Sequence, residues 1–167
     1  MNPTMKAVYA TLPQTGEVTW IGLRADKKQL PTSVQEVEVD EVSGLAGDHY
    51  GKKRGKRQVT LIQEEHLAAV SAFLGKPITP AAVRRNIVVR GINLLALKDR
   101  QFRLGDEVIL EMTGLCHPCT KMETNLGPGG FNAMRGHGGI TARVIRGGRL
   151  RLGDVVRIAL VHEAVTV

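Results

Sequence analysis

Aromatic residues and cysteines are scarce in this sequence. Three phenylalanines, one tryptophan and two tyrosines make up 4% of the 167 residues. Proteins that bind single-stranded nucleic acid stack its bases on aromatic side chains, so the composition argues against that class. The chain has only two cysteines, Cys116 and Cys119. That is too few for the disulfide framework of a small secreted domain, and we expect both to be thiols.

Long apolar stretches are also missing. No run of apolar residues approaches the roughly 20 that a transmembrane helix needs. The first residues, MNPTMKAVYATLPQTG, lack the basic start and apolar run of a signal peptide. We therefore expect a soluble, cytoplasmic protein that does not interact with a membrane.

Positive charge is present in excess. Lysine and arginine number 23 against 16 aspartates and glutamates, which gives a net charge of +7. Such an excess favours an anionic partner, which can be a nucleic acid, an acidic protein or a phosphate-bearing small molecule. Five of these cations lie within seven residues, GKKRGKR (51–57). The length, together with the absence of a linker or low-complexity segment, predicts a single domain over residues 1–167.

Short strands separated by glycine-rich turns account for most of the chain. Alternating or β-branched apolar residues predict strands over 5–10, 18–24, 34–42, 57–62 and 86–91. The segments 102–112 and 150–160 share the pattern R-L-G-D-x-V, which is typical of a turn that leads into a strand. Ile140, Ala142 and Val144 alternate in the same way.

Residues 63–75, QEEHLAAVSAFLG, give the clearest helix. Acidic residues open it, Leu67, Val70 and Leu74 share one face, and Gly75 ends it. Thr79 and Pro80 are typical of the start of a shorter helical segment. Together the elements predict a mainly β (α+β) fold, a small β-barrel with a few helices.

The segment GLCHPCTKME (114–123) holds both cysteines and permits three readings. C-x-x-C is zinc-ligand spacing, but a closed zinc site needs four ligands and the chain has no second such pair. A thioredoxin-type redox pair requires a βαβ setting, which is not predicted here. The third reading is a single working thiolate at Cys119, which Lys121 and His117 would favour. A pair of small buried apolar residues is the plain alternative.

Two further segments have the chemistry of anion binding. RRNI (84–87) places Arg84, Arg85 and Asn86 before a strand; guanidinium groups bind phosphates and carboxylates in bidentate fashion. RGHGG (135–139) offers backbone N–H groups that no side chain covers. A surface arginine pair and a flexible turn are the plain alternatives.

Taken in order, these segments resemble the MOSC domain. A basic loop runs into RQVTL; a helix, RRNIVVRGINLLAL, LGD-x-VILEMTG, a Pro–Cys pair and GGITARVIRGG-x-L-x-LGD-x-V follow. The resemblance covers roughly residues 40–158 and is closest to the stand-alone bacterial type. It implies a MOSC-type β-barrel and a role linked to the molybdenum cofactor, molybdopterin.

The resemblance also implies the site residues. Cys119 matches the family's cysteine, which ligates molybdenum in some members and is thought to carry sulfur in others. Arg84 and Asn86 match an R-x-N element expected to contact the pterin or its phosphate, and Arg57 falls where other members place positive charge. Gly138, in the turn at 136–139, and Lys121 are expected to help hold the anion. Cys116 is not part of the family pattern.

Three functions follow, in order of preference. The first is a molybdenum-dependent oxidoreductase in which Cys119 is the metal ligand and a partner protein supplies electrons to reduce N-hydroxylated small molecules. The second is a sulfur carrier in metal–sulfur cofactor assembly, with a persulfide on Cys119 and a sulfur-delivery protein as partner. The third is a non-catalytic module that binds nucleic acid through its basic face, which would be indifferent to Cys119.

Overall fold

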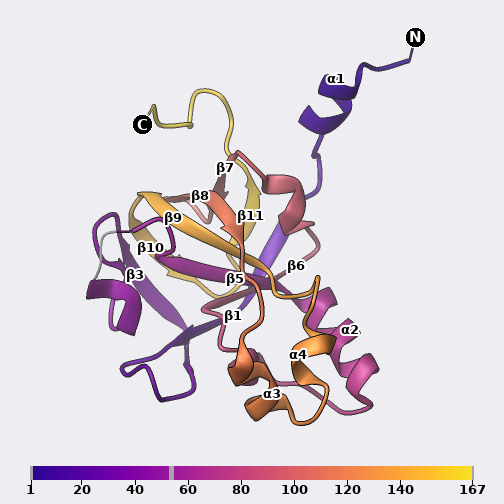
Figure 1. Cartoon of the computed structure of the whole chain (residues 1–167). Helices are drawn as coiled ribbons and strands as arrows, with labels where there is room; N and C mark the ends of the chain where they lie inside the picture. Colours follow the sequence, from indigo (N-terminus) through magenta and orange to yellow (C-terminus); the bar gives the residue numbers. More distant parts are fainter. Residues whose placement is uncertain (1, 53–54, 167) are drawn as a thin grey trace.

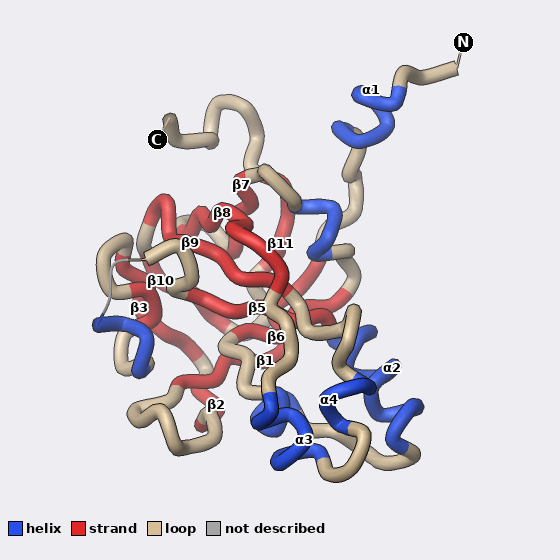
Figure 2. Tube along the Cα trace, viewed as in Figure 1, coloured by secondary structure: helices blue, strands red, loops and turns tan. Residues whose placement is uncertain are grey.

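The computed structural model describes residues 2–52 and 55–166, and these form a mainly β structure with a closed barrel (Figures 1 and 2). The strands are β1 (Gly16–Leu23), β2 (Thr32–Val34), β3 (Glu36–Asp40), β4 (Gly44–Leu45), β5 (Val59–Gln63), β6 (Ile87–Arg90), β7 (Gln101–Leu104), β8 (Val108–Leu115), β9 (Ile140–Arg146), β10 (Gly148–Arg151) and β11 (Val155–Ile158). The α-helices are α1 (Met5–Ala10), α2 (Glu64–Leu74), α3 (Thr120–Leu126) and α4 (Gly130–Ala133), with 3-10 turns η1 (His49–Lys52), η2 (Pro80–Val83) and η3 (Leu94–Leu97).

Seven strands close the barrel. Their order is β11-β7-β8-β9-β5-β6-β1, and β1 returns to β11 through the pairs Gly16–Val156 and Glu17–Val155. Every pair is antiparallel except β5 and β6, which run parallel. Parallel neighbours need a crossover connection, and α2 and η2 supply it. The short strands β10, β3 and β4 form a separate sheet.

Alternation along β5 and β6 divides the core into two parts. Leu61 and Ile87 face the barrel interior, where they pack with residues such as Phe102. Ile62 and Val88 face the opposite side and pack against apolar residues of the helices. Because both faces of these strands are covered, apolar residues follow one another without alternation at Leu61–Ile62 and at Ile87–Val89. The expected barrel with a few helices is therefore confirmed.

The N-terminal strand expected over residues 5–10 is wrong, because this segment is helix α1. Thr4 caps the helix by accepting a hydrogen bond from the backbone N–H of Ala7 at 3.2 Å. None of the helix residues is buried, and in Figure 1 the helix projects away from the barrel. Because this segment packs against no core, the alternation of its apolar residues does not reflect a buried strand face.

Other expected elements lie close to their predicted places. The helix expected over 63–75 is α2, and Gly75 ends it in the left-handed conformation with φ of 64°. The strand expected over 34–42 is shorter, since Asp40 accepts hydrogen bonds from the backbone N–H groups of Val42 and Ser43 and forms a turn. Helices α3 and α4 were not expected. Within the described residues, no helix has the length and hydrophobicity to cross a membrane.

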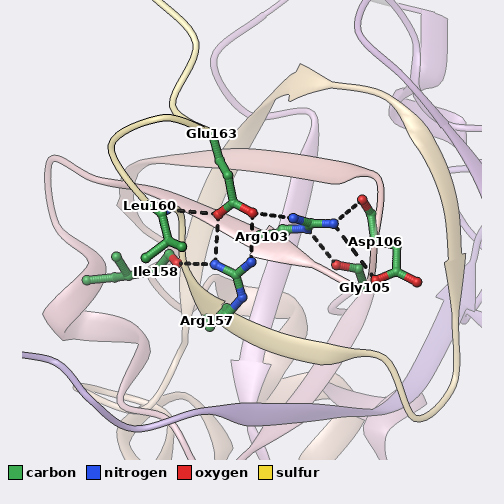
Figure 3. Close-up of polar contacts among 7 residues, drawn as sticks. All are labelled: Arg103, Gly105, Asp106, Arg157, Ile158, Leu160 and Glu163. Carbon is green, nitrogen blue, oxygen red and sulfur yellow. Dashed lines mark hydrogen bonds and ion pairs between the residues drawn. The ribbon is translucent and has the colours of Figure 1, made fainter.

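An ion cluster fastens the C-terminal turn to the barrel, as Figure 3 shows. The two carboxylate oxygens of Glu163 accept hydrogen bonds from Arg157 at 2.8 Å each, and Glu163 also pairs with Arg103. The backbone N–H of Leu160 donates to the same carboxylate at 2.9 Å. The guanidinium of Arg157, followed by the Leu160 N–H, holds the pKa of Glu163 well below its usual range.

Candidate functional site

One cavity of about 340 Å³, which we call the cationic cavity, gathers residues from six parts of the chain. It lies where the loop after β1, η1, the start of β5, the turn before β6, the segment from the end of β8 into α3, and the start of β9 meet. Its lining residues are Arg24, Lys27, Tyr50, Arg57, Thr60, Arg84, Arg85, Cys116, His117, Cys119, Lys121, Met122 and Thr141. Of the expected site residues, Cys119, Arg57, Arg84 and Lys121 are therefore brought together.

The formal charges that line the cationic cavity are all positive. Six of its residues are lysine or arginine, and no aspartate or glutamate lines it among the described residues. None of the six forms an ion pair in the part of the chain that the structure describes. Lys53 and Arg54 of the basic loop lie outside the described residues. A concave site lined by one sign of charge attracts and concentrates anions.

Arg85 is a buried clamp. Its side chain donates to the carbonyl oxygens of Gly138 (2.7 Å), Val83 (2.7 Å) and Cys116 (3.1 Å). Burial lowers the pKa of Arg85, and the thiols of Cys116 and Cys119 act in the opposite direction. The three acceptors lie in three separate segments, so this one side chain fixes the cysteine segment against the glycine turn.

Arg84 closes a loop over the same cavity. Its guanidinium donates to the carbonyl oxygens of Lys27 at 2.7 Å and Gln29 at 3.0 Å. Its backbone is left-handed, with φ of 60°. Burial lowers the pKa of Arg84, and the neighbouring Arg24 lowers it further, while Cys119 acts in the opposite direction. Arg84 thus lines the cavity, but two backbone carbonyls share its guanidinium.

Asn86 lies behind the cavity and does not line it. Its side-chain oxygen accepts from the backbone N–H and the hydroxyl of Thr60, at 3.1 and 2.9 Å. Its side-chain nitrogen donates to Gly22 O at 3.2 Å and to Asp48 Oδ1 at 3.1 Å. These bonds use both donors and both acceptor positions of the amide. In this structure Asn86 joins β1, β5 and the loop at Asp48, and it has no free group for a cofactor.

Arg24 is a site residue that the sequence did not indicate. It is only 5% exposed, although it carries a full charge. Its Nε is buried without a hydrogen-bond partner among the described residues, and its guanidinium lies 5.2 Å from the ring centroid of Tyr50. The backbone N–H of Arg24 donates to Asp48 Oδ1 at 2.8 Å, which fixes the start of this loop. A buried and uncompensated guanidinium at a cavity indicates an anionic ligand.

The two cysteines are free thiols on the same wall of the cavity. Cys119 is exposed and stands at the N-cap position of α3. Cys116 is half-buried, and its backbone N–H donates to Gly139 O at 2.9 Å. Lys121 reaches back across the cavity, and its Nζ donates to Lys27 O at 3.4 Å. No group of three or more His, Cys, Asp or Glu side chains in the described chain is placed to hold a metal, so zinc gains no support.

Gly138 has a packing role and lies outside the cationic cavity. A Cβ atom there would collide with the carbonyl oxygen of Cys116, and one on Gly139 would collide with Leu61 O. The carbonyl of Gly138 accepts from Arg85. Gly138 and Gly139 therefore permit close backbone contact between the turn, β5 and the cysteine segment. Gly138 also lines an adjoining hollow of about 160 Å³.

Comparisons with known proteins identify the family of the chain and show similar folds. The sequence profile of the MOSC domain matches residues 44–157. The structure is similar to the YuaD protein from Bacillus subtilis, with a TM-score of 0.76 and 19% identity over 87% of this chain and 97% of that one. It is also similar to YiiM from Geobacillus stearothermophilus (TM-score 0.70, 16% identity, 87% of this chain and 75% of that one) and to YiiM from Escherichia coli (TM-score 0.66, 17% identity, 86% and 70%). Among curated proteins, no sequence is similar enough to count as a relative.

Proposed function

Because the chain belongs to the MOSC domain family, we propose that its cationic cavity binds the molybdenum cofactor and that the protein reduces N-hydroxylated small molecules there. The observation that carries this proposal is the charge of Arg24, which is buried at the cavity without a compensating carboxylate or a partner for its Nε among the described residues. The thiol of Cys119 lines the same cavity.

The residues fit the chemistry of this cofactor. Its phosphate is anionic, and guanidinium and ammonium groups bind phosphate through charge-assisted hydrogen bonds. Arg24, Lys27 and Arg57 are available for this purpose. Molybdenum is a thiophilic metal, for which a cysteine thiolate is a suitable ligand. A cavity of about 340 Å³ lies within the range of small-molecule sites.

Within this proposal the residues of the chain have separate tasks. Arg24, Lys27 and Arg57 bind the anionic end of the cofactor, and Cys119 binds the metal. Arg85 orients the cysteine segment through Cys116 O, while Arg84 keeps the loop at Lys27 closed over the cavity. When bound, the cofactor supplies two-electron redox chemistry, and a partner protein supplies the electrons. His117, which is exposed at the cavity, adds an imidazole that can form a hydrogen bond with a bound molecule.

The test is reduction of benzamidoxime by protein purified anaerobically from a cofactor-producing host, with a low-potential dye as the electron source. Wild-type protein and Cys116→Ala are expected to form benzamidine. Cys119→Ala is expected to lose at least a hundredfold in rate while it keeps the wild-type melting temperature. Full activity of Cys119→Ala would overturn the proposal, and Cys116→Ala serves as the matched control.

A second candidate, a sulfur carrier, is favoured by the presence of both thiols at one cavity. A sulfur-delivery protein would transfer one sulfane sulfur atom to the Cys119 thiolate, and the product would be a persulfide. Mass spectrometry of protein purified without reductant would then find an added sulfur on Cys119 that dithiothreitol removes, and no bound metal. Binding of nucleic acid is less favoured, because six of the cations converge on one cavity.

A further inference from the structure

A second hollow, which we call the apolar hollow, lies beside the β8 end of the site. It has a volume of about 370 Å³ and is formed by η3 and the second half of β8. Leu95, Met112 and Leu115 supply its apolar surface, and Lys98 and Asp99 supply its charged groups. None of these residues lines the cationic cavity.

The smaller hollow of about 160 Å³ described above adjoins both the apolar hollow and the cationic cavity, because it shares lining residues with each. Leu95 and Leu115 line both the apolar and the smaller hollow. Cys116 and His117 line both the smaller hollow and the cationic cavity. The three spaces therefore follow one another along the end of β8, with the cysteine segment between the apolar and the cationic parts.

Hydrogen bonds to the barrel fix the elements that line the apolar hollow. The side chain of Asn93 accepts a hydrogen bond from the backbone N–H of Leu95 at 3.0 Å, and Gln63 accepts one from Leu94 N–H at 3.0 Å. On the other side, β8 pairs with β9 as far as Leu115, which faces Ile140. The hollow is thus built between paired and capped elements.

Two leucines are exposed at this fixed place. Leu95 is 41% exposed and Leu115 is 47% exposed. Single exposed leucines are ordinary on a protein surface. These two, however, belong to different elements and line the same two hollows next to a thiol. Their exposed area is available to an apolar group. An ionic group would lose hydration there and would meet only Lys98 and Asp99, one charge of each sign.

We propose that the apolar hollow binds the uncharged, apolar body of a small-molecule substrate, whose polar reacting end lies at the cysteine segment. The substrate class is thereby an uncharged N-hydroxylated compound with an aryl or alkyl body. The reaction rests on the function proposed above, whereas the binding of an apolar group does not. The cationic cavity and the apolar hollow then hold different chemical groups, an anion and an uncharged body.

The first test is binding of the neutral fluorophore N-phenyl-1-naphthylamine to the full-length protein. Wild-type protein is expected to give saturable fluorescence enhancement. Leu95→Gln and Leu115→Gln should each weaken binding at least fivefold. The control is Leu160→Gln, because Leu160 is 49% exposed and lines none of the three hollows. Absence of saturable binding, or equal affinity in wild type and both hollow variants when all retain wild-type melting temperatures, would overturn the proposal.

The second test separates this proposal from the proposed function. With benzamidoxime and N-hydroxyurea as the apolar and the polar substrate, Leu115→Gln should raise KM for benzamidoxime at least fivefold and leave KM for N-hydroxyurea unchanged. Equal effects on both substrates would contradict the hollow's role while the reductase function stands. If no variant or wild-type protein reduces either compound, yet fluorophore binding still depends on Leu95 and Leu115, the apolar site stands and the reductase function fails.

Discussion

The guanidinium of Arg85 donates a hydrogen bond to the carbonyl oxygen of Cys116 at 3.1 Å, although the two residues are 31 positions apart. Arg85 Nε donates to Gly138 O at 2.7 Å, and Gly138 lies so near the same Cys116 carbonyl that a Cβ atom would collide with it. The position of the cysteine segment therefore depends on a buried arginine and a glycine that are remote in the sequence.

Replacement of Arg85 is expected to be costly. Arg85→Met would leave three buried or partly buried carbonyl oxygens without their donor. Each lost partner of this kind costs about 1–3 kcal/mol, and for three of them we expect a total loss of at least about 3 kcal/mol in the free energy of unfolding. Urea denaturation measures it. The control is Arg149→Met at an exposed ion pair with Glu38, where the expected loss is below about 1 kcal/mol.

Arg24→Met is expected to raise, and not lower, the free energy of unfolding. The charge of Arg24 is buried without a carboxylate partner among the described residues, so its removal should raise the stability of the ligand-free protein by about 1 kcal/mol. The same change should weaken binding of inorganic pyrophosphate about tenfold. Thermal unfolding with and without pyrophosphate measures both effects. A variant that binds pyrophosphate as tightly as wild type would remove Arg24 from the anion site.

Asn86→Ala tests whether Asn86 is structural. Its amide joins Thr60, Gly22 and Asp48, and we expect its loss to lower the free energy of unfolding by about 2–3 kcal/mol. Because Asn86 does not line the cationic cavity, pyrophosphate affinity of the folded protein should change less than twofold. Calorimetric titration of the folded variant gives that affinity. A large loss of affinity with normal stability would restore the direct ligand contact that the sequence predicts.

Glu163 makes stability depend on acid pH. Its pKa is lowered in the folded state from an ordinary value of 4.5. A carboxyl group of this kind stabilises the folded state above its unfolded pKa, and that contribution is lost as pH falls toward the folded pKa. Glu163→Gln should therefore lower the melting temperature at pH 7, and the difference from wild type should shrink as pH falls from about 4.5 to 3. A difference that is constant with pH would contradict the ionic cluster of Figure 3.

The sequence predicts elements well where apolar residues have a core to face. Helix α2 and strands β5 and β6 follow from the periodicity and apolar runs of residues 57–91. Helix α1 was predicted as a strand because none of its residues is buried, so the order of its apolar residues carries no information on which face packs against a core. The helices at 120–133 were missed because glycine and proline in NLGPGG interrupt any helical pattern.

The site was predictable only in part. Cys119, Arg57, Arg84 and Lys121 were expected from the resemblance to the MOSC domain, and the cavity brings them together. Arg24 was missed, because its importance arises from burial against Tyr50 and from a bond to Asp48, 24 residues away. Asn86 and Gly138 form hydrogen bonds with partners 26 to 64 positions away in the chain, and no local sequence pattern predicts such partners.

The most direct test of the account is the molybdenum content of the protein. Wild type, Cys119→Ala and Cys116→Ala would be produced in a cofactor-synthesising host, purified anaerobically and measured by elemental analysis. The account predicts about one molybdenum per chain in wild type and in Cys116→Ala, and a loss of most of it in Cys119→Ala. Wild-type protein without molybdenum, or equal molybdenum in all three proteins, would contradict it.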